Sequence, residues 1–235
     1  MVDSAALRVR LASVRDRVAR AAGRARRDPA SIRIVAVSKT FTAEHVRVAA
    51  DAGQLDFGEN KVQEGLQKIA QTADLQIKWH LVGHLQSNKA RKAGARFDVV
   101  HSMDSAGLIG KLDEAARAEG RTLDLLVQVD LAGEATKHGA QEAELAPIFD
   151  AARRCRAARV VGLMLLPPAT DDPQGARPYF RALRDMRDRL LARDVDGSTV
   201  GELSMGMSHD FEVAVEEGAT LVRVGTAIFG GRSVR

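Results

Sequence analysis

The sequence has 235 residues, a length that suits one large domain. Lys and Arg total 35 against 31 Asp and Glu, so the formal net charge is only +4. The basic residues are scattered and no basic block is interleaved with aromatic residues, which argues against a nucleic-acid-binding protein. The longest apolar run, residues 160–166, is too short to cross a bilayer. The single cysteine, Cys155, excludes an internal disulfide and fits a reducing compartment, so we expect a cytoplasmic protein without a membrane span.

The first predicted element is a helix over residues 3–26, where Leu7, Leu11, Val14 and Val18 recur at helical spacing. A regular alternation of strands and helices follows. Strand-like runs occur at residues 32–38, 55–58, 77–83, 98–102, 123–130, 159–165, 202–205 and 220–225. Helical patterns lie between them at 43–52, 60–72, 87–95, 105–119, 141–156, 174–193 and 209–217.

Several of these strand-like runs are apolar on both faces, as is typical of parallel strands covered by helices. Eight such strands in a chain of this length predict one domain over residues 1–235, a (β/α)8 TIM barrel preceded by the N-terminal helix. The alternative is a doubly wound open sheet. No G-x-G-x-x-G follows the first strand, which weakens a dinucleotide-binding version of that alternative.

In such a barrel the chemistry lies at the carboxyl ends of the strands, and polar residues gather there in this sequence. Asn60 follows the second strand and could instead cap the next helix. His80 and His84 are four residues apart, but they span a strand and a glycine turn and have no clear third ligand. We therefore expect no metal site, and we expect His80 to be a hydrogen-bonded residue lining the barrel.

The segments "SMGMS" and "GTAIFGG" follow the seventh and eighth strands. Barrels frequently hold a phosphate between these two loops, where small side chains and unpaired backbone N–H groups favour an anion. Gly225 and Thr226 are the candidates here, although Gly225 could simply ease a turn.

Arg223 alternates with Leu221 and Gly225 on the eighth strand, so it is predicted to point into the barrel. A buried guanidinium needs an anion or an acceptor. The alternative to a ligand contact is an ion pair with an internal carboxylate such as Asp130.

Lys39 ends the first strand in "RIVAVSKTF" and has the same strand parity as Val35 and Val37. If those valines face inward, Lys39 reaches the barrel mouth, where a partly desolvated amine can act as a nucleophile. A nucleophilic lysine, a phosphate site and an arginine able to meet a ring nitrogen together indicate a pyridoxal phosphate pocket.

The segments "VAVSKTF", "FGENKVQE", "WHLVGHLQSNK", "HSMDS" and "LSMGMSHDFEVAVEEGATLVRVGTAIFG" resemble the pyridoxal phosphate homeostasis proteins, the YggS/PROSC family. That family is similar to the N-terminal barrel of alanine racemase, of fold type III. The resemblance implies pyridoxal 5'-phosphate as cofactor, held as an internal aldimine on Lys39. It also implies that Ser204, Gly225 and Thr226 hold the phosphate, that Arg223 faces the pyridine nitrogen and that Asn60 lies near the ring. Weaker implied contacts come from His80, Met205 and Val37. The loop at 136–139 fits the family, with no role that we could assign.

Racemisation needs two bases, one on each face of the substrate. In alanine racemase the second base is a tyrosine supplied with a C-terminal domain, whereas the one tyrosine here, Tyr179, lies in a predicted outer helix. An arginine at the ring nitrogen also makes the ring a poorer electron sink. We therefore expect no enzyme but a carrier that stores and supplies the cofactor. The alternatives are a residual racemase and a Schiff-base aldolase. The expected partners are pyridoxal phosphate and the apoenzymes that receive it, and the expected state is a monomer.

Overall fold

A computed structural model describes residues 2–133, 138–192 and 200–231. Eight parallel strands pair in chain order and close into a barrel, because β1 also pairs with β8. The predicted (β/α)8 barrel with a preceding helix is therefore confirmed, and the open sheet is wrong. The strands are β1 (Arg33–Val37), β2 (Asp56–Glu59), β3 (Lys78–Leu81), β4 (Val99–Met103), β5 (Leu123–Val129), β6 (Ala158–Leu165), β7 (Glu202–Met207) and β8 (Leu221–Val224).

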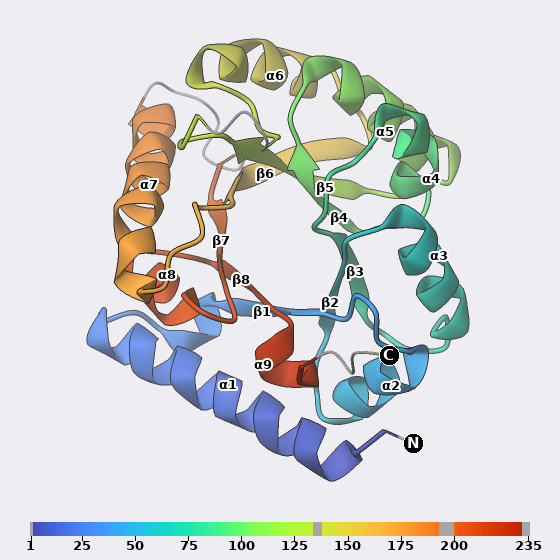
Figure 1. Cartoon of the computed structure of the whole chain (residues 1–235). Helices are drawn as coiled ribbons and strands as arrows, with labels where there is room; N and C mark the ends of the chain where they lie inside the picture. Colours follow the sequence, from blue (N-terminus) through green and yellow to red (C-terminus); the bar gives the residue numbers. More distant parts are fainter. Residues whose placement is uncertain (1, 134–137, 193–199, 232–235) are drawn as a thin grey trace.

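Helices form a ring around the barrel (Figure 1). They are α1 (Ser4–Arg24), α2 (Ala43–Asp51), α3 (Val62–Gln71), α4 (Ala90–Gly94), α5 (Ala106–Ala118), α6 (Leu145–Ala152), α7 (Arg177–Ala192), α8 (Phe211–Glu216) and α9 (Thr226–Phe229). Single 3₁₀ turns occupy Pro29–Ser31, Ser87–Lys89, Glu142–Glu144 and Pro173–Ala176. The predicted helices at 87–95, 141–156 and 174–193 therefore each include a 3₁₀ turn, where the chain is wound more tightly than the pattern suggested.

The N-terminal helix α1 completes the ring of helices beside α8, α9 and α2 (Figure 1). Asp3 caps it by accepting a hydrogen bond from the amide of Ala6 at 3.0 Å. Its apolar stripe is buried as predicted, and the Arg10 Nε donates to the Ile228 carbonyl of α9 at 2.8 Å. Because α9 is only four residues long, α1 covers barrel surface that a longer last helix would otherwise cover.

The apolar core has two layers. The larger cluster lies between the strands and the helices, and a smaller one fills the barrel interior. The interior cluster consists of Val35, Val37, Val82, Val99, Leu126, Met164 and Leu221. The prediction that Val35 and Val37 face inward is therefore confirmed, and the side chains after β1 are directed toward the barrel mouth.

No helix among the residues that the structure describes has the length and apolar character needed to cross a membrane.

Candidate functional site

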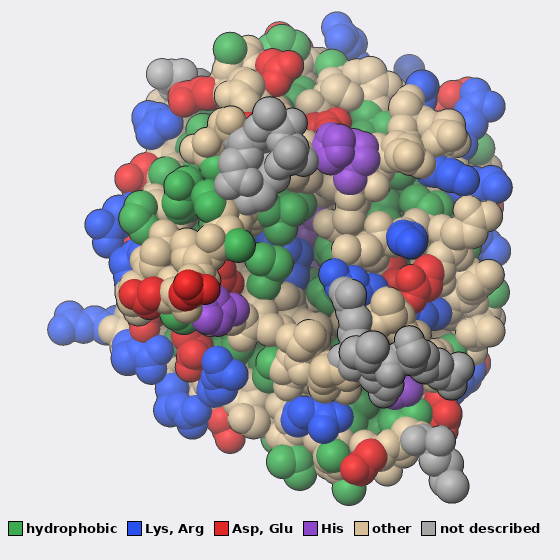
Figure 2. Space-filling model, in the orientation of Figure 1, with side chains coloured by type: hydrophobic (Ala, Val, Ile, Leu, Met, Phe, Trp, Pro, Cys, Tyr) green, Lys and Arg blue, Asp and Glu red, His purple; other side chains and the backbone are tan. Residues whose placement is uncertain are grey.

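A cavity of about 500 Å³ opens at the carboxyl ends of the strands. In the view down the barrel, basic and histidine side chains are visible near the centre of this face (Figure 2). The cavity is lined by Val37, Lys39, Asn60, Val82, Gly83, His84, Gln128, His138, Leu166, Met207, Ser208, His209, Arg223, Gly225 and Thr226. Six of the nine predicted site residues belong to this lining: Val37, Lys39, Asn60, Arg223, Gly225 and Thr226. Ser204, Met205 and His80 do not.

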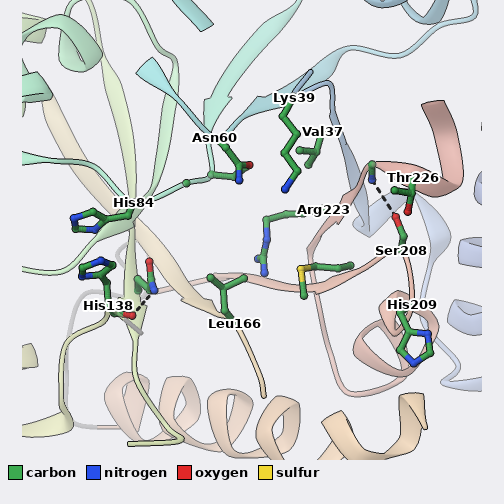
Figure 3. Close-up of a pocket in the computed structure, with 15 residues that line it drawn as sticks. Val37, Lys39, Asn60, His84, His138, Leu166, Ser208, His209, Arg223 and Thr226 are labelled. Carbon is green, nitrogen blue, oxygen red and sulfur yellow. Dashed lines mark hydrogen bonds between the residues drawn. The ribbon is translucent and has the colours of Figure 1, made fainter. Parts of the chain in front are cut away.

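Lys39 follows β1 in a turn whose next residue, Thr40, has a φ of 71°. The Lys39 side chain is only partly exposed and extends into the cavity in the direction of Arg223 (Figure 3). Positive φ is costly for a β-branched residue, so surrounding contacts must hold this turn. The position of Lys39 thus depends on the buried side chains that hydrogen-bond to the backbone of this turn.

A buried ionic group, here called the Lys68 cluster (Ser38, Glu59, Glu64 and Lys68), lies beneath the turn. Lys68 is 5% exposed, and its Nζ donates to the Ser38 carbonyl at 2.7 Å, to Glu59 Oε1 at 2.6 Å and to Glu64 Oε1 at 2.8 Å. Glu64 Oε1 also accepts the backbone N–H of Thr40 at 2.6 Å. The cluster therefore ties α3 directly to the backbone on both sides of Lys39.

Glu59 is the most confined member of the Lys68 cluster. Its side chain is fully buried, and Oε1 accepts the Ser38 hydroxyl at 2.7 Å in addition to Lys68. Its Oε2 has no hydrogen-bond partner among the described residues. Burial raises the pKa of the Glu59 carboxyl, and the bonds from Lys68 and Ser38 oppose that rise only in part.

Arg223 points into the barrel from β8, as its strand parity predicted, and lines the cavity floor. Its guanidinium donates to Ser204 Oγ at 2.6 Å and to the Leu165 carbonyl at 2.8 Å. The alternative ion pair with Asp130 is wrong, because that carboxylate accepts instead from the amides of Ala132 and Gly133. Burial lowers the pKa of Arg223 to about 10, which leaves the guanidinium charged at neutral pH.

Ser204 continues a line of polar groups through the barrel, here called the interior chain (Asp56, His80, His101, Ser204 and Arg223). His101 Nδ1 lies 2.8 Å from Ser204 Oγ, and its Nε2 lies 2.8 Å from His80 Nδ1. His80 Nε2 lies 2.9 Å from Asp56 Oδ1. Both histidines and Ser204 are completely buried. Burial lowers the pKa of His101 well below its ordinary value, and the nearby Arg223 guanidinium lowers it further.

Ser204 therefore contacts the predicted ring-binding arginine and lies away from the proposed phosphate loops. Met205 is fully buried in the outer core, and His80 is buried in the barrel interior, so neither reaches the cavity in this structure. The expectation that His80 is a hydrogen-bonded residue of the barrel is confirmed. His101, the partner of His80, was not singled out from the sequence.

Ser208, which the sequence analysis did not single out, lines the cavity beside the start of α9. Its hydroxyl accepts the backbone N–H groups of Gly225 at 3.1 Å and Ala227 at 3.3 Å, which joins the loop after β7 to the start of α9 (Figure 3). Thr226, the residue between those two amides, is exposed at the cavity. These groups together offer hydroxyl and amide donors on one side of the cavity.

Gly206 makes the approach of these loops possible. It has a φ of 91°, and a Cβ there would come within 2.5 Å of the Ala214 Cβ and 2.9 Å of the Phe211 Cα. The glycine lets β7 turn closely over α8, so that Met207 and Ser208 face the cavity.

Asn60 lies across the cavity from these loops, directly after β2 (Figure 3). It is not the N-cap of α3, because that helix begins at Val62 and Lys61 precedes it in the cap position. The end of β3 packs against the Asn60 backbone: a Cβ at Gly83 would lie 2.2 Å from the Asn60 carbonyl oxygen. The close contact with Gly83 fixes the backbone that carries the Asn60 amide.

The rim opposite Ser208 carries His84 and His138, whose rings stack with centroids 3.5 Å apart and planes 11° from parallel. Gln128 donates to the His138 carbonyl, which anchors this end of the loop after β5. The predicted loop at 136–139 is only partly visible, since Thr136 and Lys137 lie outside the described residues.

His84, His138 and Asp104 have possible ligand atoms within 4.8 Å of one another. A histidine binds a metal in the plane of its ring, and two nearly parallel planes 3.5 Å apart do not meet at one ion. His80, which the sequence placed beside His84 as a possible ligand, lies in the interior chain instead. The arrangement therefore does not carry a metal site.

The fold and the site define a class of protein, a parallel barrel with a ligand-sized cavity at its mouth. The cavity is formed by a lysine after β1, an inward arginine on β8 and the loops after β7 and β8, which carry hydrogen-bond donors. The sequence matches the family described as the N-terminal domain of alanine racemase over residues 9–233. A solved alanine racemase from Corynebacterium glutamicum shares this fold, with a TM-score of 0.73 at 16% identity, over 100% of this chain and 63% of the racemase.

A narrower group matches more closely. A pyridoxal phosphate homeostasis protein from Aquifex aeolicus is 40% identical over 223 residues, which is 95% of this chain and 97% of that protein. The structure of PipY from Synechococcus elongatus with PLP bound has a TM-score of 0.84 at 39% identity, covering 95% of this chain and 100% of PipY. The chain belongs to the family of the pyridoxal phosphate homeostasis proteins.

Proposed function

We propose that this protein binds pyridoxal 5'-phosphate, holds it covalently on Lys39, and stores and supplies it within the cell. One observation carries the proposal: Lys39, Arg223 and the Ser208–Thr226 loops line the same cavity, although they are far apart in the sequence. The relative whose structure contains PLP supports the choice of this cofactor over other phosphate esters.

The residues present fit the three parts of the cofactor. The phosphate would be held by the hydroxyls of Ser208 and Thr226 and by the amides that now donate to Ser208. The Lys39 amine would bond to the aldehyde carbon as a Schiff base, with the aldehyde oxygen leaving as water. Arg223 would meet the ring nitrogen with N–H groups that have no acceptor among the described residues.

The Arg223 contact limits what the bound cofactor can do. A pyridine nitrogen facing a guanidinium accepts a hydrogen bond and stays unprotonated, because arginine keeps its proton. The bound group supplies electrophilic chemistry at its aldehyde carbon and, with a neutral ring, only weak stabilisation of a carbanion. The site thus favours storage of the cofactor over catalysis with it.

The cavity residues that the structure describes include no tyrosine, the group that serves as the second base in alanine racemase. Tyr179 is the only tyrosine of the chain, and it packs from α7 against the outer core, away from the cavity lining. Racemisation needs a proton donor on the face opposite Lys39. We therefore propose a carrier that passes the cofactor to apoenzymes, and that acts as a monomer in the cytoplasm.

A spectrum of the purified protein tests the proposal. We expect a yellow protein whose absorbance is bleached by borohydride, with the reduced pyridoxyl group found on Lys39 by peptide mapping. Lys39→Ala should lose this absorbance and keep weaker binding through the phosphate contacts. Lys111→Ala is the matched control, because Lys111 is an exposed lysine at a neighbouring rim. A wild-type protein that stays colourless with added cofactor would contradict the proposal.

The phosphate contacts can be tested separately with pyridoxal, which lacks the anion. Charge-assisted hydrogen bonds are worth roughly 1.5–3 kcal/mol each, so pyridoxal should bind far more weakly than its phosphate. Ser208→Ala and Thr226→Ala should each weaken binding of the phosphate form without unfolding the barrel. Equal affinity for the two forms would place the phosphate elsewhere.

The carrier role is tested by following alanine in heavy water. We expect exchange at Cα no faster than with free pyridoxal phosphate. Slow exchange without inversion would report Lys39 alone, since one base returns a proton to one face only. Net racemisation at about 1 s⁻¹ or faster, which is within the normal range of enzymes, would show that the protein is a catalyst instead.

A further inference from the structure

The interior chain crosses the barrel from one end to the other. Asp56 is the first residue of β2 and lies at the amino-terminal end of the strands, with its side chain 15% exposed. Arg223 lies at the cavity floor near the carboxyl ends. Between them, His80, His101 and Ser204 have no exposed surface, and every ring nitrogen and the hydroxyl have a partner at 2.6–2.9 Å.

The direction of these hydrogen bonds is fixed from both ends. An arginine can only donate, so Ser204 Oγ accepts from Arg223. A carboxylate can only accept, so the proton between Asp56 and His80 lies on His80 Nε2. Two neutral imidazoles then have one solution: His101 donates from Nε2 to His80 Nδ1, and Ser204 donates to His101 Nδ1.

The links depend on one another. While Ser204 donates its proton to His101, both hydroxyl lone pairs are available to Arg223 and all three groups have a partner. This donation requires an unprotonated Nδ1 on His101, which in turn requires an unprotonated Nδ1 on His80. Asp56 enforces the last condition by accepting from His80 Nε2. Without the Asp56 acceptor, both imidazoles can take the opposite tautomer, in which His101 donates to Ser204 and the hydroxyl must accept from His101 and Arg223 at the same time while its own proton loses its partner.

We propose that Asp56, His80, His101 and Ser204 are positioning residues that act through Arg223, as one hydrogen-bonded chain with a single direction. This inference rests on the proposed function, because the Arg223 guanidinium is taken to meet the ring of the cofactor. The chain makes cofactor binding sensitive to a carboxylate at the far end of the barrel, which touches no part of the cavity.

The first test needs no cofactor. Nitrogen-15 NMR of the histidine-labelled protein near neutral pH should show His80 and His101 as neutral rings, each with its proton on Nε2. In Asp56→Leu this pattern should be lost at both rings. A proton on Nδ1 of His101, or a charged His80, in the wild-type protein would overturn the proposed direction.

The second test measures the cofactor. Asp56→Leu should weaken binding of pyridoxal phosphate by about threefold to tenfold, the size expected for one hydrogen bond, and should displace the absorbance maximum of the bound form. Asp124→Asn is the control, because Asp124 also lies near the amino-terminal end of a strand but pairs with Arg159. It should change neither measurement.

A double variant separates positioning from a general loss of stability. In an Arg223→Leu background, Asp56→Leu should have no further effect on binding, because its action passes through the guanidinium. An equal loss in both backgrounds would overturn the positioning role. Ser204→Ala breaks the same chain beside Arg223 and replaces Asp56→Leu if that variant does not fold.

The outcomes distinguish this inference from the proposed function. If the wild-type protein takes up no cofactor, the proposed function fails. If the wild type binds cofactor and Asp56→Leu binds it equally well with the same spectrum, the proposed function stands and the positioning role is wrong.

Discussion

The Lys68 cluster and the interior chain are both buried and polar, but they lie on opposite sides of the barrel wall and are built differently. The Lys68 cluster lies between α3 and the ends of β1 and β2. It holds a lysine between two carboxylates, and one Glu59 oxygen has no hydrogen-bond partner within the part of the chain that the structure describes. The interior chain lies inside the barrel, and each of its groups between the two ends is hydrogen-bonded on both sides.

The difference shows two ways of placing a functional group. The Lys68 cluster holds a backbone turn, and its contacts to the Ser38 carbonyl and the Thr40 amide determine where Lys39 begins. The interior chain holds a side chain, the Arg223 guanidinium. Removing one charge from an ion pair leaves the other buried and uncompensated, whereas removing one link of a neutral chain costs a single hydrogen bond. The cluster should therefore matter more for stability, and the chain more for the cofactor.

The largest expected effect is on the Lys68 cluster. Lys68→Met leaves the Glu59 carboxyl fully buried without its cation, and should lower the free energy of unfolding by about 3 kcal/mol. Urea denaturation measures this change. Adding Glu59→Gln should recover at least half of the loss, because the uncompensated charge is then gone. If the Lys68→Met protein is as stable as the wild type, the Lys68 cluster does not contribute more to stability than the interior chain, and the comparison is wrong.

A smaller effect concerns pH and the interior chain. The pKa of His101 is depressed in the folded protein, so the unfolded chain binds a proton at this residue before the native state does. The stability contributed by the neutral ring is therefore present above the unfolded pKa and is lost as pH falls below it. This amounts to about 1.4 kcal/mol between about pH 7.5 and 5.5, taking an unfolded pKa of about 6.5.

His101→Gln should remove this part of the pH dependence, and urea denaturation at the two pH values measures it. The control is His209→Gln, because His209 is exposed. An unchanged pH dependence in His101→Gln would mean that the ring accepts a proton inside the folded barrel, contrary to a neutral interior chain.

The smallest effect tests the backbone that the Lys68 cluster holds. Thr40 has a φ of 71°, a conformation that glycine adopts without steric cost. Thr40→Gly keeps the backbone N–H that donates to Glu64. It should raise the free energy of unfolding by up to about 1 kcal/mol, because the strain is relieved. Thr40→Ala is the control, because alanine keeps the strain. A loss of stability in Thr40→Gly would show that the Thr40 side chain, rather than the cluster, supports the turn.

The barrel and the directions of Lys39 and Arg223 followed from the sequence because they rest on local periodicity. The alternation of strands and helices is visible in the chain, and a strand places every second side chain on the same face. Val35, Val37 and Leu221 face the interior as this rule requires, and Lys39 and Arg223 follow from them. The family resemblance assigned the phosphate to Ser204, Gly225 and Thr226, of which Gly225 and Thr226 line the cavity and Ser204 does not.

Ser204 and Ser208 show where strand parity fails to predict which side chain faces the cavity. Ser204 pairs with Leu221 and Met207 pairs with Arg223, so three steps along β7 match two steps along β8. Such a bulge arises from the contacts between strands and changes which residues face the interior. It leaves Ser204 beneath Arg223 and brings Ser208 to the cavity.

By itself, the sequence determined the closed barrel, the lysine at its mouth and the arginine within it, because each depends on the spacing of residues along one strand or helix. Only the tertiary structure decided which distant groups meet. His80 and His101 contact each other because β3 and β4 are neighbours, and Lys68 is buried because α3 packs beside the turn after β1. Nothing within residues 60–72 distinguishes Lys68 from a solvated helix residue. Long-range packing supplies the burial and the hydrogen-bond partners that give these side chains their charge states and their roles.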